Sequence, residues 1–165
     1  MTDMDLLHRV GAFLYREAEL LDAGRFAAWA ELFADPCVYW IPVDPTVTEV
    51  WQGMSHVNDD RQLLLARTHR LDNPRVMSPE PLPRTVHFVS NIRIADVAAD
   101  GTLTVKATAL VHEYRPRGYG DDDKRAFAGR VTYRLLPDGG DFRIAFKRVD
   151  LVDSEGSYNA ILVPI

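Results

Sequence analysis

Hydrophobic residues in the first part of the chain recur at the spacing of helices. Between Asp5 and Leu21 the apolar positions return every three or four residues, which is the spacing of one helical face. The turn Asp22-Ala23-Gly24 ends this predicted helix, because glycine readily adopts the left-handed conformation found at helix ends. A second, shorter helix is predicted from Phe26 to Phe33, and Asp35-Pro36 is its predicted end because proline cannot continue a helix.

A strand, a loop and a third helix are predicted next. Cys37 to Ile41 is a short run rich in β-branched and aromatic residues between two prolines, which is typical of a strand. Pro42 to Gly53 has no clear period and predicts a loop that carries Trp51. The pair Asn58-Asp59 predicts the cap of a helix that runs to about Leu71.

The rest of the chain alternates at period two, the spacing of strands. In the first of these strands four apolar residues are expected on one face: Val86, Phe88, Ile92 and Ile94. The polar residues expected on the other face are His87, Asn91 and Arg93. Asp100-Gly101 predicts a hairpin turn, and further strands are predicted around Leu103 to Val111, Phe127 to Leu135 and Phe142 to Phe146. A later change of apolar phase predicts a β-bulge near Lys147 or Arg148.

Two segments are predicted to be loops. Asn73 to Pro83 contains four prolines in eleven residues, and Gly118 to Lys124 is rich in glycine and aspartate. With helices first and strands last, residues 1–165 are expected to form a single α+β domain. Its curved antiparallel sheet is expected to wrap over the N-terminal helices and to leave a cone-shaped cavity.

Charge and composition exclude several classes of function. The 165 residues carry a net charge of −5 without a basic cluster, which argues against a nucleic-acid partner. The apolar runs are far shorter than the ~20 residues of a membrane span, and no secretory signal is recognisable, so a cytoplasmic location is expected. Cys37 is the only cysteine, which excludes a cysteine-rich zinc or iron–sulfur site held by this chain alone.

The first helix pair and strand, Phe13 to Pro42, read FLYREAELLDAGRFAAWAELFADPCVYWIP. This stretch resembles the N-terminal signature of the small (β) subunit of bacterial aromatic-ring-hydroxylating dioxygenases, which are Rieske non-heme iron enzymes. Four later blocks resemble the family in order and spacing: DDRQLLLARTHRL at Asp59 to Leu71, PRTVHFVSNIRI at Pro83 to Ile94, AFAGRVTYRL at Ala126 to Leu135, and FKRVDLVD at Phe146 to Asp153. The loop from Pro42 to Val57 departs from the family pattern, since it is short and lacks the usual tyrosine- or acid-rich sequence.

The resemblance implies the cone-shaped fold shared with ketosteroid isomerase and scytalone dehydratase. It also implies a non-catalytic partner of a larger α subunit, which in that family carries the Rieske [2Fe-2S] cluster and the mononuclear iron. Three α and three β subunits commonly assemble there, with contacts between β subunits. No cofactor is expected on this chain, because its five histidines form no HxxxH or HExxH pair.

Several polar and aromatic residues are predicted to contact another subunit: Trp51, Arg84, His87, Asn91, Arg93 and Tyr114. Tryptophan, tyrosine and arginine contribute most to binding at protein interfaces. Two simpler interpretations stay open, namely that the polar residues form an ordinary exposed sheet face and that Trp51 covers its own core.

An enzymatic alternative places an acid–base pair inside the cone, as in a stand-alone dehydratase or isomerase. The residues for it are Asp35, Tyr39, His87 and His112. Period-two counting puts both histidines on the polar faces of their strands, which favours a structural or interface role. A third possibility is a homo-oligomeric module that binds a small apolar ligand in the cone.

Overall fold

The structure is a computed structural model and describes residues 3–73, 82–116, 124–156, 158 and 161–165. The helices are α1 (Asp3–Asp22), α2 (Phe26–Ala30) and α3 (Arg61–Asp72). The strands are β1 (Phe33–Pro42), β2 (Ser55–Asp59), β3 (Arg84–Val97), β4 (Leu103–Tyr114), β5 (Lys124–Asp138) and β6 (Asp141–Leu151). No helix of the described ranges is long and apolar enough to cross a bilayer.

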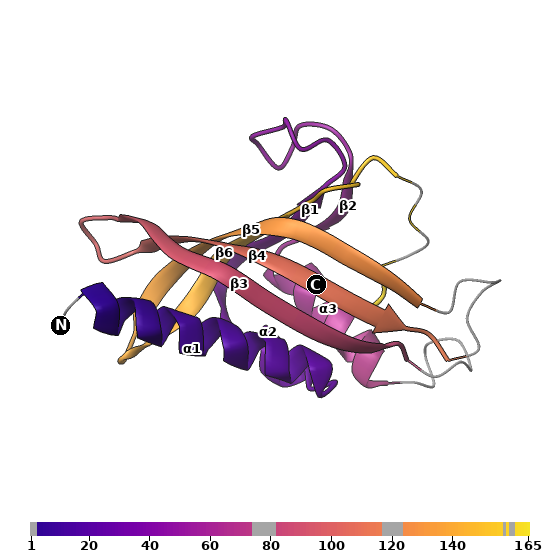
Figure 1. Cartoon of the computed structure of the whole chain (residues 1–165), viewed down its shortest axis with the longest axis horizontal. Helices are drawn as coiled ribbons and strands as arrows, with labels where there is room; N and C mark the ends of the chain where they lie inside the picture. Colours follow the sequence, from indigo (N-terminus) through magenta and orange to yellow (C-terminus); the bar gives the residue numbers. More distant parts are fainter. Residues whose placement is uncertain (1–2, 74–81, 117–123, 157, 159–160) are drawn as a thin grey trace.

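The strands form one curved sheet in the order β2-β1-β6-β5-β4-β3 (Figure 1). The helices lie along one side of it, with α1 beside β3 (Figure 1). The predicted α+β fold, a curved sheet over N-terminal helices, is confirmed. One detail differs, because β1 pairs with β6 in parallel while the other neighbours are antiparallel. These two strands are far apart in sequence, so no hairpin fixes their relative direction.

Helix α1 forms where the periodicity predicts it. Its apolar face buries Val10, Phe13, Leu14 and Leu21 against the sheet and the other helices. Gly24 follows the helix with a φ of 67°, the left-handed conformation predicted for this turn. The first predicted helix is therefore confirmed, with its ends within two residues of the prediction.

The second helix is shorter than predicted. It ends at Ala30, and Phe33 instead begins β1, where it pairs with Ile144 of β6. The Ile144 N–H also donates to the carbonyl of Leu32 at 2.8 Å. The prediction that Asp35-Pro36 ends a helix was wrong, because pairing with β6 outweighs the local helical pattern.

The predicted cap of α3 lies one residue later than expected and follows a strand. Asp60 is the N-cap, and its side chain accepts a hydrogen bond from the Leu63 N–H at 2.9 Å. Asp59 is the last residue of β2, opposite Tyr39 of β1. The sequence did not predict β2, since Val57 is the only apolar residue among its five.

Strand β3 changes its inward face part-way along. Five of its residues face the helices: Thr85, His87, Val89, Ile92 and Ile94. Asn91 separates the two sets with a φ of 54°, and the register with β4 shifts between Ser90 and Arg93. This is a β-bulge, which reverses the faces of a strand by adding one residue.

The bulge overturns part of the predicted pattern. Val86 and Phe88 were expected inside with Ile92 and Ile94, but they are 50% and 56% exposed on the outer face. His87 was expected on the polar face, but its side chain points inward and is only 4% exposed. A period-two count continued through an inserted residue assigns one half of the strand to the wrong face.

The predicted bulge in β6 exists, but it lies at Ala145 and not at Lys147 or Arg148. Arg134 pairs with Phe146 and Leu135 with Ile144, which leaves Ala145 without a partner in β5. The shift brings Lys147 to the inner face together with Val149 and Leu151.

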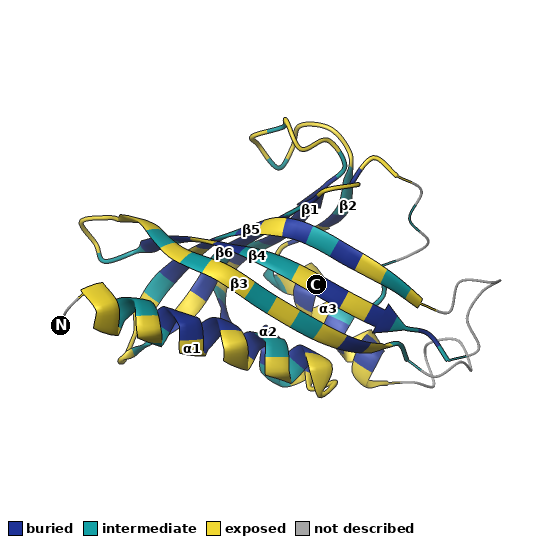
Figure 2. Cartoon of the chain, in the orientation of Figure 1, coloured by how far each residue is buried: buried dark blue, intermediate teal, exposed yellow. Residues whose placement is uncertain are grey.

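The core fills the space between the inner face of the sheet and the helices. Buried and exposed residues alternate along β4 and β5, as expected for strands with one covered face (Figure 2). Most of the two predicted loops, Asn73–Pro83 and Gly118–Lys124, lies outside the described residues.

Candidate functional site

A buried ion pair lies between α1 and the inner face of β6. Lys147 Nζ donates to Glu17 Oε1 at 2.7 Å, and the two side chains are 3% and 4% exposed. Glu17 lies on the buried face of α1, and the bulge at Ala145 turns Lys147 towards it. Each charge is removed from water and is balanced by the other.

Aromatic side chains surround this ion pair. Trp29 Nε1 donates to Glu17 Oε1 at 3.1 Å, and the Tyr133 hydroxyl donates to Glu17 Oε2 at 2.9 Å. The Lys147 ammonium lies 5.6–5.9 Å from the ring centroids of Trp29, Tyr39 and Tyr133. Burial, followed by the Glu17 carboxylate, raises the pKa of Tyr133 well above its ordinary value. Glu17 thus accepts three hydrogen bonds in a buried site, which stabilises its charge but offers no base to a solvent-borne substrate.

The end of the chain packs against the same core. The Ile165 N–H donates to the Tyr39 hydroxyl at 3.0 Å, and that hydroxyl donates to the Ile165 carbonyl at 3.1 Å. Tyr39 is fully buried, and burial raises the pKa of its phenol. Val163 is also buried. Both hydrogen bonds of the Tyr39 hydroxyl are therefore made with the backbone of Ile165.

A second polar cluster joins the end of α1 to β3. His87 Nδ1 lies 2.6 Å from Asp22 Oδ1, and the His87 backbone N–H donates to Asp22 Oδ2 at 3.0 Å. The Thr85 hydroxyl donates to the same carboxylate at 3.1 Å, and His87 Nε2 lies 3.3 Å from the Pro164 carbonyl oxygen. Burial favours the neutral acid at Asp22, but the hydrogen bonds from His87 and Thr85 outweigh it and lower the pKa of Asp22. His87 is therefore committed within the chain and is not available to a partner.

The other predicted interface residues lie at the surface or near it. Trp51 is 76% exposed in the loop between β1 and β2, so the alternative that it covers its own core is wrong. Arg84 stacks over the ring of Tyr114, its neighbour in the β3–β4 register, with 5.0 Å between the guanidinium carbon and the ring centroid. Asn91 and Arg93 are exposed at the β3 bulge.

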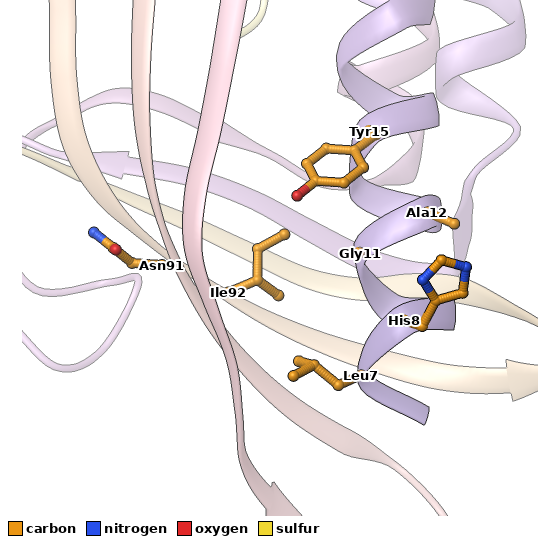
Figure 3. Close-up of a pocket in the computed structure, with 7 residues that line it drawn as sticks. All are labelled: Leu7, His8, Gly11, Ala12, Tyr15, Asn91 and Ile92. Atoms are coloured by element: carbon orange, nitrogen blue, oxygen red, sulfur yellow. The ribbon is translucent and has the colours of Figure 1, made fainter. Parts of the chain in front are cut away.

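A groove of about 320 Å³ lies between α1 and β3. Tyr15 and Ile92 point towards each other across it, whereas Asn91 points to the other side of β3 (Figure 3). His8 is the only histidine among its lining residues, and its ring points away from Ile92 (Figure 3). The groove offers apolar surface without a paired acid and base.

Comparison of the chain with models of protein families identifies its family. The family model described as "Ring hydroxylating beta subunit" matches residues 16–155. The chain belongs to this beta-subunit family. The expected resemblance to small subunits of aromatic-ring-hydroxylating dioxygenases is thereby confirmed.

Individual relatives agree with this assignment. The beta subunit is 36% identical over 137 residues to the small oxygenase component of the p-cumate 2,3-dioxygenase system of Pseudomonas putida, covering 82% of this chain and 73% of that protein. A structure of naphthalene 1,2-dioxygenase with indole bound in the active site has a TM-score of 0.82 at 20% identity, over 99% of this chain and 87% of that one. A putative scytalone dehydratase from Novosphingobium aromaticivorans has a TM-score of 0.65 at 16% identity, over 92% and 89%. The fold expected from the scytalone dehydratase resemblance is thus confirmed.

The described side chains of this beta subunit do not offer the ligand set of an iron centre. Within the described ranges, no group of three or more histidine, cysteine, aspartate or glutamate side chains could hold a metal ion. Cys37 is buried in β1, where burial raises the pKa of its thiol. A Rieske cluster takes two cysteine and two histidine ligands, and a chain with one cysteine cannot supply them.

The residues of the enzymatic alternative do not converge. Tyr39 and His87 lie inside, where both are bonded to the C-terminal segment. Asp35 is exposed on β1. His112 is exposed on the outer face of β4, as the period-two count predicts, so the sheet separates it from the interior. These four residues form no acid–base site in the beta subunit.

The cluster of Glu17, Lys147 and Tyr133 was not predicted from the sequence. One signal was present, because Glu17 occupies the apolar stripe of α1, seven residues after Val10 and four before Leu21. A charged residue in that position needs a buried partner. The partner could not be named from the sequence, since the position of the β6 bulge decides whether Lys147 points inward.

Proposed function

We propose that this beta subunit is a non-catalytic structural subunit of a multicomponent aromatic-ring-hydroxylating dioxygenase that takes part in aromatic compound catabolism. It supports assembly of a larger, iron-containing α subunit. The observation that carries the proposal is the filled interior, where Glu17, Lys147 and Tyr133 bond one another and are shielded from solvent. The p-cumate relative, named as the small oxygenase component of a dioxygenase system, supports the same role.

The proposed complex contains three α and three β subunits, with β subunits in contact with one another. The Rieske [2Fe-2S] cluster and the mononuclear iron belong to the α subunit. The described side chains of this chain do not offer the ligands of either iron centre, which supports placing both centres on the α subunit.

Co-expression with the cognate α subunit tests this proposal. We expect the two chains to purify together in equal numbers, measured by light scattering and native mass spectrometry, with the iron in the α subunit. As a control, the beta subunit purified alone should contain no iron and should not oxidise the aromatic substrate of the complex. Turnover of that substrate by the beta subunit alone, without iron or a reductase, would contradict the proposal.

A further inference from the structure

The outer face of the sheet carries an apolar band. Phe88 lies opposite Leu110 in the β3–β4 register, and Leu110 lies opposite Ala128 in the β4–β5 register. Val86, two residues before Phe88, faces the same way because the bulge at Asn91 comes after both. Val86, Phe88 and Leu110 are 44–56% exposed, so their apolar surface is not used by the core of this chain.

A basic band borders the apolar one. Arg93 and Lys106 are direct partners in the β3–β4 register, and Arg130 lies one strand further, on β5. All three are exposed, and within the described ranges none of them forms a salt bridge. Asp150, which faces Arg130 in the β5–β6 register, is bonded to Arg148 at 2.7 Å. The basic band therefore keeps its positive charge.

The loop from Val43 to Met54, at the far edge of the sheet, presents apolar side chains together with negative charge. Trp51 and Met54 are both 76% exposed. The acidic residues Asp44 and Glu49 are exposed in the same loop, which contains no lysine or arginine. The loop projects beyond β1 and β2, whereas the two bands lie towards β3 (Figure 1).

Hydrogen bonds hold this loop in one shape. Arg148 donates to the Val47 carbonyl at 2.7 Å and to the Pro45 carbonyl at 3.0 Å. The Gln52 side-chain oxygen accepts from the backbone N–H groups of Thr48 and Glu49 at 3.2 and 3.3 Å. An exposed tryptophan on a loop that is already ordered loses little conformational entropy on binding, which favours docking.

We infer that the loop from Val43 to Met54 of one copy of this chain, which carries Trp51, docks on the apolar and basic bands of a second copy. Trp51 and Met54 would cover Phe88 and Leu110, and Glu49 with Asp44 would face the basic band. The two surfaces lie near opposite edges of one sheet, so the contact is head-to-tail, and such contacts close into rings when the rotation permits. The inference deepens the proposed function, on which it rests, by naming the surfaces between β subunits.

Complementary charge favours a second copy as the occupant. The chain has a net charge of −5, so two copies repel each other unless acidic and basic surfaces are matched locally. A contact between the same loop of two copies would place Asp44 and Glu49 of one copy against the same acidic residues of the other. The pairing of loop with band joins opposite charges and covers apolar side chains on both sides.

Sedimentation velocity of the purified chain tests the inference by charge reversal. We expect the wild type to self-associate, and the band variant K106E/R130E and the loop variant E49K each to weaken association at least about tenfold. The combined variant E49K/K106E/R130E should regain part of the lost affinity, since the charge reversed at position 49 again faces opposite charges in the band. Arg25→Glu, an exposed reversal outside both surfaces, is the matched control and should change nothing.

Trp51→Ala tests the apolar part of the contact and should also weaken self-association about tenfold. Leu63→Ala, at an exposed position on α3, is its control and should leave self-association unchanged. A wild-type chain that remains monomeric would overturn the inference, as would band and loop variants that associate like the wild type. If the variants self-associate normally but no longer bind the α subunit, these surfaces contact the α subunit instead, and that result would also overturn the inference. Failure of the wild type to bind α would instead contradict the proposed function and leave the self-association result standing.

Discussion

Glu17 and Lys147 place opposite charges among buried aromatic rings, where neither has access to water. A buried pair of this kind is costly to break, because removal of one partner leaves an unpaired charge in the interior. Replacement of both partners by neutral residues removes that penalty. The pair therefore constrains how α1 and β6 pack without itself being needed for chemistry.

Substitution of this pair gives the first prediction. Lys147→Met should lower the free energy of unfolding by about 3–5 kcal/mol, because the Glu17 carboxylate is then buried without its cation. The double variant E17Q/K147M should recover most of the loss, since the introduced glutamine side chain is neutral and can still accept a hydrogen bond. Urea unfolding measures both. Arg16→Met, which breaks the exposed pair with Asp141, is the control and should cost less than about 1 kcal/mol.

The Asp22 carboxylate gives a prediction for pH. Its pKa is lower in the folded protein than its ordinary value of 3.8, so its stabilising contribution is present above that value. The contribution disappears as the pH falls through the folded pKa, because the folded state must then bind a proton. Urea unfolding from about pH 6 to about pH 2.5 should find wild type more stable than Asp22→Asn, by a margin that shrinks below pH 3.8. A margin that is constant over this range would contradict the assignment.

At the scale of elements, the two bulges decide which side chains face the core. Periodicity and turn signals predicted α1, α3 and the hairpin after β3, because each is encoded within a short stretch of sequence. The bulge at Asn91 and the one at Ala145 depend on pairing with another strand, so the faces of β3 and β6 were only partly predictable. The inward positions of His87 and Lys147 follow from these bulges, which is why both polar clusters were missed.

The conformation of Asn91 gives a prediction at this scale. Asn91 has a φ of 54°, which asparagine and glycine tolerate and which β-branched residues do not. Asn91→Val should lower the free energy of unfolding by about 1–2 kcal/mol, whereas Asn91→Gly should stay within about 1 kcal/mol of wild type. Thermal and urea unfolding compare the three proteins. Equal stability of the valine and glycine variants would show that the bulge can move along β3.

At the scale of the whole molecule, the structure separates an interior of buried side chains from an outer surface that exposes large apolar side chains. The interior holds Glu17, Tyr39 and Lys147 in mutual contact or against the end of the chain. The outer surface exposes Trp51 and Phe88. This distribution suits a subunit that binds other chains better than one that admits a small substrate, and it agrees with the beta-subunit family.

The most direct test of the non-catalytic role is the turnover of the assembled complex when the exposed acid–base candidates are removed. In complexes that carry Asp35→Asn and His112→Ala in the beta subunit, we expect turnover of the aromatic substrate to stay within about twofold of the wild-type complex, since a group that takes no part in the reaction adds nothing to transition-state stabilisation. Light scattering must confirm that the assembly is intact. A loss of about a hundredfold or more in an intact complex, the size expected for a general acid or base, would show that the beta subunit takes part in catalysis.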